Sequence, residues 1–154
     1  MTLKAIKSAF IALMKTKYPL SAYKYYSMAV VEGYQRPCFF TDIQIDESEP
    51  LGRNTYRYRG HFDVELLQKV VDEGQALDCF DTLRNLFGIS VKVGDRAIKV
   101  LGMDYSYSGT DGNVMMMSVD LEWTDTIAHE APPGSDVVME TLGYEQKLTI
   151  DYEK

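Results

Sequence analysis

Residues 33–66 read GYQRPCFFTDIQIDESEPLGRNTYRYRGHFDVEL, and this stretch decides the fold of the chain. From residue 53 onward, apolar and polar side chains alternate. The apolar set is Tyr56, Tyr58, Phe62, Val64 and Leu66, with Gly60 among them. Successive side chains of a β-strand point to opposite faces, so the alternation predicts a long strand with one apolar and one charged face. Residues 38–45 alternate in the same way, and residues 47–52 combine charges with turn formers. We therefore predict a hairpin on which the other elements pack.

Two segments have the apolar spacing of amphipathic helices. The first runs from residue 3 to about residue 18, begins after the potential cap Thr2 and ends at Pro19. The second runs over residues 75–87 and stops at Gly88. The apolar stripes are Leu3, Ile6, Phe10, Leu13 and Met14 in the first helix, and Leu77, Phe80, Leu83, Leu86 and Phe87 in the second.

Further strands are predicted over residues 23–31, 89–93, 96–107 and 114–124. In the last of these, one face is formed by Met115, Met117, Val119, Leu121 and Trp123. The pattern predicts an α+β fold, a mostly antiparallel β-sheet with two main helices packed on its apolar face.

The chain divides by pattern into an α+β core domain, residues 1–124, and an acidic C-terminal extension or docking arm, residues 125–154. After a Pro- and Gly-containing break at residues 131–135, residues 137–142 suggest a helical turn and residues 146–152 an edge strand. At 154 residues one folded domain is the expectation.

Charge is placed unevenly within the overall −7. Residues 1–30 hold five lysines and no acid, whereas residues 125–154 hold seven acids and two lysines. An acidic chain is repelled by phosphates, which argues against general nucleic-acid binding. A basic end and an acidic end can instead attract each other between copies, although two solvated surfaces without a partner are the simpler interpretation.

The sequence offers little for chemistry. It has no cofactor-binding motif, and neither His61 nor His129 has a partner at metal-ligand spacing, so we expect no cofactor and no metal site. Cys38 and Cys79 lie in apolar contexts and are expected to be buried, reduced thiols. No membrane-length apolar run and no signal peptide are visible, which favours a cytoplasmic place of synthesis.

The most informative polar feature is the arginine face, which we define as Arg53, Arg57, Arg59 and His61. Arginine forks bind carboxylates and phosphates equally well, so this face is a candidate contact surface for a neighbouring subunit or for DNA passing a channel. The alternative is a solvated sheet face whose charges are balanced by Asp63 and Glu65.

The segment GYQRPCFF follows an N-terminal helix and precedes an acidic loop and an Arg/Tyr strand. In this order of elements, over roughly residues 2–123, the chain resembles the phage and prophage tail terminator, or tail completion, family. The resemblance implies a non-enzymatic structural protein that caps the tail tube as a ring, usually a hexamer, stops tube growth and presents the head-joining surface. Implied partners are copies of itself, the tail tube protein and a neck or head-completion protein, with DNA only as passing cargo and no membrane.

The resemblance places the protein in a virion or phage-tail-like particle assembled in the host cytoplasm, where the free protein is a ring or a monomer. Three alternatives remain open at this point. One is another neck, tail-completion or head–tail connector role in the same particle. The others are a small enzyme or ligand-binding domain, which a deep pocket or buried acids would favour, and a nucleic-acid-binding protein.

Overall fold

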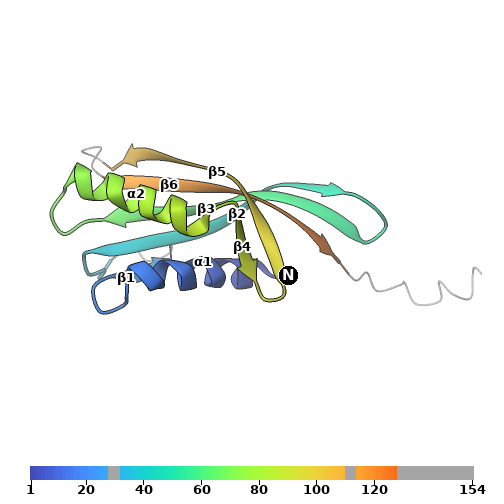
Figure 1. The fold of residues 1–154 in the computed structure, drawn as a ribbon, viewed down its shortest axis with the longest axis horizontal. Helices are drawn as coiled ribbons and strands as arrows, with labels where there is room; N and C mark the ends of the chain where they lie inside the picture. The colour runs from blue at the N-terminus through green and yellow to red at the C-terminus, as the bar shows by residue number, and fades with distance from the viewer. Residues whose placement is uncertain (28–31, 110–113, 128–154) are drawn as a thin grey trace, which may run out of the picture.

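A computed structural model describes residues 1–27, 32–109 and 114–127 of the chain. Its elements in chain order are α1 (Leu3–Lys17), β1 (Lys24–Ser27), β2 (Cys38–Pro50), β3 (Thr55–Leu67), α2 (Glu73–Phe87), β4 (Ser90–Val93), β5 (Arg96–Ser108) and β6 (Val114–Thr126). They form a two-layer α+β domain in which both helices cover one face of a curled sheet (Figure 1). The predicted fold class is confirmed.

The helix boundaries have local causes. The side chain of Thr2 accepts a hydrogen bond from the Ala5 amide at 3.2 Å, so Thr2 is the N-cap of α1 as predicted. Asp72 caps α2 in the same way through the Gln75 amide, also at 3.2 Å, and α2 begins two residues earlier than predicted. Gly88 follows the last helical residue with φ of 56°, a conformation that glycine adopts without strain.

The six strands are ordered β1-β2-β3-β6-β5-β4 in one sheet. All neighbouring pairs are antiparallel except β1 and β2, which run parallel. The two central strands, β3 and β6, are paired from Thr55 opposite Thr126 to Leu66 opposite Met115. The strand predicted from residue 53 onward, β3, thus lies at the centre of the sheet, with β2 beside it.

The core lies between the helices and the apolar face of the sheet. Phe10 of α1 contacts Phe62 of β3 and Phe87 of α2, with ring centroids 4.8 and 4.9 Å apart. The predicted apolar face of β6 is buried throughout, including Trp123, which is 6% exposed. Within the helices the stripes are narrower than predicted, because Leu3 and Leu77 are each 36% exposed.

The predicted end of β2 is wrong. The sequence suggested that β2 ends at Ile45 and that residues 47–52 connect the strands, but β2 continues to Pro50. A register shift between Ile45 and Glu47 interrupts the ladder, which then resumes with Glu47 opposite Arg59 and Glu49 opposite Arg57. The acidic residues therefore belong to a strand that is paired with arginines across the hairpin.

Several sequence-based expectations lie outside the described residues. These include part of the strand predicted over residues 23–31, the helical turn at 137–142 and the edge strand at 146–152. Among the described residues, both cysteines are buried and neither forms a disulfide. No helix in the described part of the chain is long and apolar enough to cross a membrane.

Candidate assembly surfaces

The β2–β3 hairpin extends beyond the layer of helices as a projecting arm (Figure 1). We define the hairpin arm as residues 46–58, in which the β2 portion, residues 46–50, is exposed. A hydrogen bond from the Leu51 amide to the Thr55 carbonyl, 2.8 Å long, closes its turn. On one side, β6 supports the arm through the pairing of β3 with residues up to Thr126. An isolated two-stranded hairpin is marginal in water, so this support is what holds the arm out from the body.

Ion pairs connect the strands along the arm and at its base. Arg57 contacts Glu49 at 3.3 Å, and Arg59 contacts Glu47 at 3.3 Å and Glu122 of β6 at 3.2 Å. The predicted balancing residues, Asp63 and Glu65, are not the partners of these arginines among the described residues. The side chains of Arg57 and Arg59 are 39% and 49% exposed, so each ion pair contributes at most about 1 kcal/mol to stability.

His61 is held by two carboxylates. Its Nδ1 lies 2.9 Å from Asp46 Oδ2, and its Nε2 lies 3.4 Å from Asp63 Oδ2. The hydrogen bond with Asp46 raises the pKa of His61 from its usual 6.5, and the negative charges of Asp63 and Asp120 act in the same direction. Partial burial of the His61 ring acts in the opposite direction and lowers this pKa.

The structure brings only part of the arginine face together. Arg57, Arg59 and His61 share one face of β3, whereas Arg53 lies apart in the turn at the tip of the arm. Arg53 is exposed and makes no ion pair with any described residue. The arginine face therefore consists of a strand-borne group and a separate cation at the tip.

Carboxylates outnumber cations on the polar face of the sheet, the side away from the helices. Strand register and the His61 contact place there Asp42, Asp46, Glu47, Glu49, Asp63, Glu65, Asp104, Asp120 and Glu122, against Lys24, Arg57, Arg59, Lys92 and Lys99. The net charge of this face is negative, so it would repel DNA phosphates rather than bind them.

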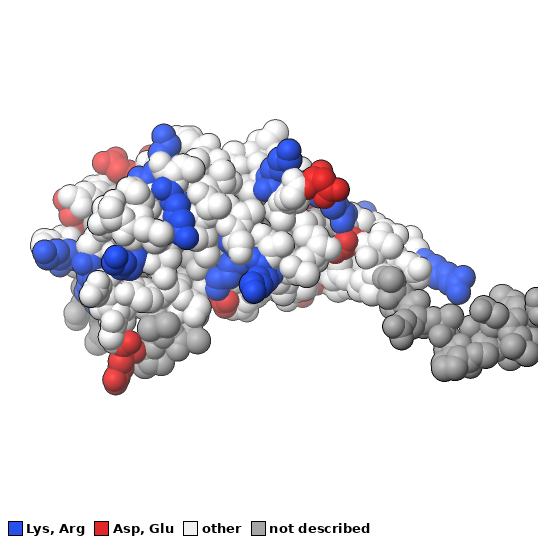
Figure 2. Space-filling view, turned by 90° about the horizontal axis from the view of Figure 1, so that it is seen from below, with Lys and Arg blue, Asp and Glu red and all other residues white. Residues whose placement is uncertain are grey.

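The first helix presents the opposite charge. Lys4, Lys15 and Lys17 of α1 are exposed, and Figure 2 shows Lys and Arg side chains spread over the side of the molecule that carries this helix. Lys7 instead turns to the sheet, where its amino group donates to the Thr41 carbonyl at 2.6 Å. One chain thus carries a basic helix and an acidic sheet face.

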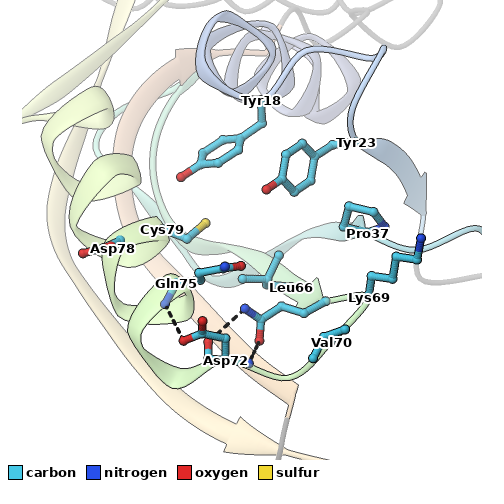
Figure 3. A pocket seen from close by; sticks show the side chains of 11 residues that line it. Tyr18, Tyr23, Pro37, Leu66, Lys69, Val70, Asp72, Gln75, Asp78 and Cys79 are labelled. Atoms are coloured by element: carbon cyan, nitrogen blue, oxygen red, sulfur yellow. Dashed lines mark hydrogen bonds between the residues drawn. The ribbon is translucent and has the colours of Figure 1, made fainter.

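A cleft lies at the end of the molecule opposite the arm. Its volume is about 570 Å³, within the range of ligand sites, and it lies between the end of α1, the start of α2 and the end of β3. Figure 3 shows the hydroxyl groups of Tyr18 and Tyr23 pointing into it, above Leu66 and Cys79. Sequence reasoning missed this cleft, because its lining comes from segments far apart in the chain.

Two tyrosines and a cysteine with raised pKa values line the cleft. Burial raises the pKa of both tyrosines, so their hydroxyls remain protonated at neutral pH. Burial also raises the pKa of Cys79 to about 11, which keeps this thiol from acting as a nucleophile. In the described part of the chain, no cluster of three or more His, Cys, Asp or Glu residues could hold a metal ion.

The structure thus combines a two-layer α+β fold with an exposed arm, oppositely charged surfaces and a cleft. The comparisons with known proteins identify the family. A family model described as phage tail terminator protein matches residues 5–133, and the chain belongs to this family. It is therefore a structural component of a phage tail.

A solved protein structure shares the fold, with a TM-score of 0.51 and 16% identity over 85% of this chain and 99% of the other. At this identity the likeness concerns the fold alone. No curated protein matches the chain.

Proposed function

We propose that this protein caps the end of the tail tube as a hexameric ring, terminates tube growth and forms the surface to which the head is joined. The observation that carries the proposal is the match of the tail terminator family to residues 5–133. The projecting arm and the oppositely charged surfaces support it, because they offer material for contacts between copies and with other tail proteins.

The proposed partners are further copies of the chain, the tail tube protein and a neck or head-completion protein, in a particle assembled in the host cytoplasm. Arg53, Arg57, Arg59 and His61 belong to the contact surface in this proposal. DNA passes the ring as cargo only, since the acidic polar face disfavours phosphate binding. Contacts between charged surfaces are weakened by salt, so the free protein can be a monomer that closes into a ring on the tube end.

Residues 125–154 extend the charge argument. They carry seven acids and two lysines, and the N-terminal 30 residues carry five lysines and no acid. One of the seven acids, Asp125, belongs to β6 and pairs with Arg96 at 2.7 Å. We infer that this acidic extension is a docking arm that contacts a neighbouring protein in the particle. An extension of this charge fits a basic surface such as that of α1 on the next copy.

The deciding experiment is the length of tails assembled without this protein. Particles from cells in which the gene is deleted are measured by electron microscopy, with the gene restored in trans as the control. The proposal expects overlong tails that lack heads, because nothing stops the growth of the tube.

Other outcomes of the deletion point elsewhere. Tails of normal length that fail to join heads would assign the protein to the neck or to a head–tail connector. Normal tails that carry heads would exclude both roles, whatever ring the purified protein forms.

A further inference from the structure

The arm lies at one end of the long axis of the molecule (Figure 1). The end of α1, the end of β3 and the start of α2, which line the cleft, lie at the other end. The arm and the cleft each have features that their own chain leaves unused. Because the arm projects away from the body, its tip cannot reach the cleft of the same copy. The tip of the arm can therefore occupy a cleft only on another molecule.

The tip of the arm is the turn formed by residues 51–54. Leu51 is 46% exposed, so the end of the projecting hairpin presents a large apolar side chain to solvent. Arg53 is exposed beside it and has no ion pair among the described residues. The turn thus presents one apolar and one cationic side chain on a support that is only a few residues wide.

The cleft has the complementary character. Its floor contains the apolar side chain of Leu66, and its rim contains Val70, which is 76% exposed. Asp72 and Asp78 line the cleft from the start of α2, with Glu73 beside them, and outnumber Lys69, the one lining cation among the described residues. Asp78 makes no ion pair with a described residue. In Figure 3, Asp78 lies on the outer flank of α2, at the edge of the cleft.

We propose that the turn of residues 51–54 of one copy seats in the cleft of the next copy. Leu51 packs against the apolar floor, and Arg53 lies beside the acidic start of α2. The contact joins opposite ends of two identical chains, so it is head-to-tail and generates a ring when the rotation closes. This inference rests on the proposed ring and names the surfaces that form it.

Charge reversal tests the electrostatic part in a phage that lacks the gene and receives variants in trans. Arg53→Glu and Asp78→Lys should each produce overlong tails, and the double variant should restore normal length because the attraction is re-formed with opposite sign. Lys92→Glu and Asp95→Lys are the matched controls, since both residues are exposed, make no ion pair with described residues and lie on the β4–β5 hairpin. Singles that behave like the controls, or a double variant that stays defective, would overturn the pairing.

Cross-linking tests the contact itself. Leu51→Cys combined with Val70→Cys in the full chain should give disulfide-linked multimers in isolated tails and in concentrated purified protein. Leu51→Cys with Ile89→Cys is the control, because Ile89 is 86% exposed but lies beyond the far end of α2. The native Cys38 and Cys79 are buried and should not contribute.

The result separates this inference from the proposed function. If gene deletion gives overlong tails but the cysteines at positions 51 and 70 do not cross-link, the terminator role stands and the contact between tip and cleft is wrong. The same negative result is expected if a small molecule or another tail protein fills the cleft. Normal tails after deletion would overturn the function, and the cross-link in purified protein would then still report on the contact between copies.

Discussion

At the residue scale, Gly60 shows how a single missing side chain permits the central pairing of the sheet. A Cβ atom at this position would lie 2.2 Å from the Gln44 carbonyl oxygen, a backbone atom that cannot move without disturbing the β2–β3 ladder. Gly60 lies opposite Ile45, next to the register shift that begins the hairpin arm. The close approach therefore belongs to the geometry of the bulge.

Replacing Gly60 with alanine should lower the free energy of unfolding by about 1–3 kcal/mol, because the added methyl group forces the two backbones apart. Urea unfolding followed by circular dichroism measures the loss. Gly102→Ala is the control in another strand, where the nearest atom, a side-chain oxygen of Asp120, would be 3.8 Å away. Equal stability of the two variants would contradict the proposed clash.

Trp123 should be a main contributor to stability at the base of the arm. It is 6% exposed and stacks on Tyr58, with ring centroids 5.5 Å apart. Trp123→Ala should cost about 3–5 kcal/mol of unfolding free energy. Thr124→Ala, which changes the exposed neighbour, should stay within about 0.5 kcal/mol of the wild type. A loss below about 1 kcal/mol for the tryptophan variant would show that this face is not packed as described.

His61 makes the stability of the arm dependent on pH. Its pKa is raised in the folded protein, chiefly by the Asp46 hydrogen bond, so the protonated form favours folding. This stabilisation is fully present below the unfolded pKa of about 6.5 and is lost as the pH rises through the raised pKa. The unfolding free energy of wild type minus that of His61→Gln should therefore be larger at about pH 5.5 than at about pH 9. A difference that is constant with pH would refute the interaction.

At the element scale, the hairpin shows what sequence patterns can and cannot predict. The alternation from Tyr56 to Leu66 predicted β3 and its buried face, because a period of two depends only on neighbouring residues. The extension of β2 to Pro50 was not predicted. Glu47 and Glu49 resemble turn residues until their partners across the strand, Arg59 and Arg57, are known, and that register is a non-local property.

The surfaces were less predictable than the core for the same reason. The sequence indicated Arg57, Arg59 and His61 as one face, which the strand confirms, but it gave no sign that carboxylates from β2, β5 and β6 would outnumber them. The separation of Arg53 from the other three depends on where the turn begins. The cleft depends on the docking of α1 and α2, which no local pattern specifies.

Whether Arg57 acts within the arm or between proteins can be decided by swapping its ion pair. Arg57→Glu places two carboxylates opposite each other, and we expect overlong tails from it. Combining Arg57→Glu with Glu49→Arg restores a pair across β2 and β3 but reverses the charges presented to a neighbour. Overlong tails from the combined variant would assign Arg57 to a contact between proteins, as we propose. Normal tails would limit it to the arm.

At the scale of the whole molecule, the main consequence of the fold is that its two ends, and its two sides, differ from each other. The arm lies at one end of the sheet and the cleft at the other, while a basic helix and an acidic sheet face occupy different sides. A two-fold contact uses the same patch on both copies and is complete with two of them. A head-to-tail contact brings unlike surfaces together, which is the arrangement that a closed ring requires.

Because the tip and the cleft of one copy meet different neighbours in a ring, mixing two defective proteins tests whether the number of copies is even. Arg53→Glu and Asp78→Lys copies, produced together in a phage lacking the gene, can alternate around a ring. Each tip that carries the new glutamate then meets a cleft that carries the new lysine, and each unchanged Arg53 tip meets an unchanged Asp78 cleft. An alternating ring closes only when the number of copies is even, as in a hexamer, so normal tail length should return although each variant fails alone.

Arg53→Glu mixed with Leu51→Asp is the control, because both copies are defective at the tip and no order of copies around the ring repairs them. If the double variant of the two charges supports normal tails but the mixture does not, the ring has an odd number of copies and the proposed hexamer is wrong.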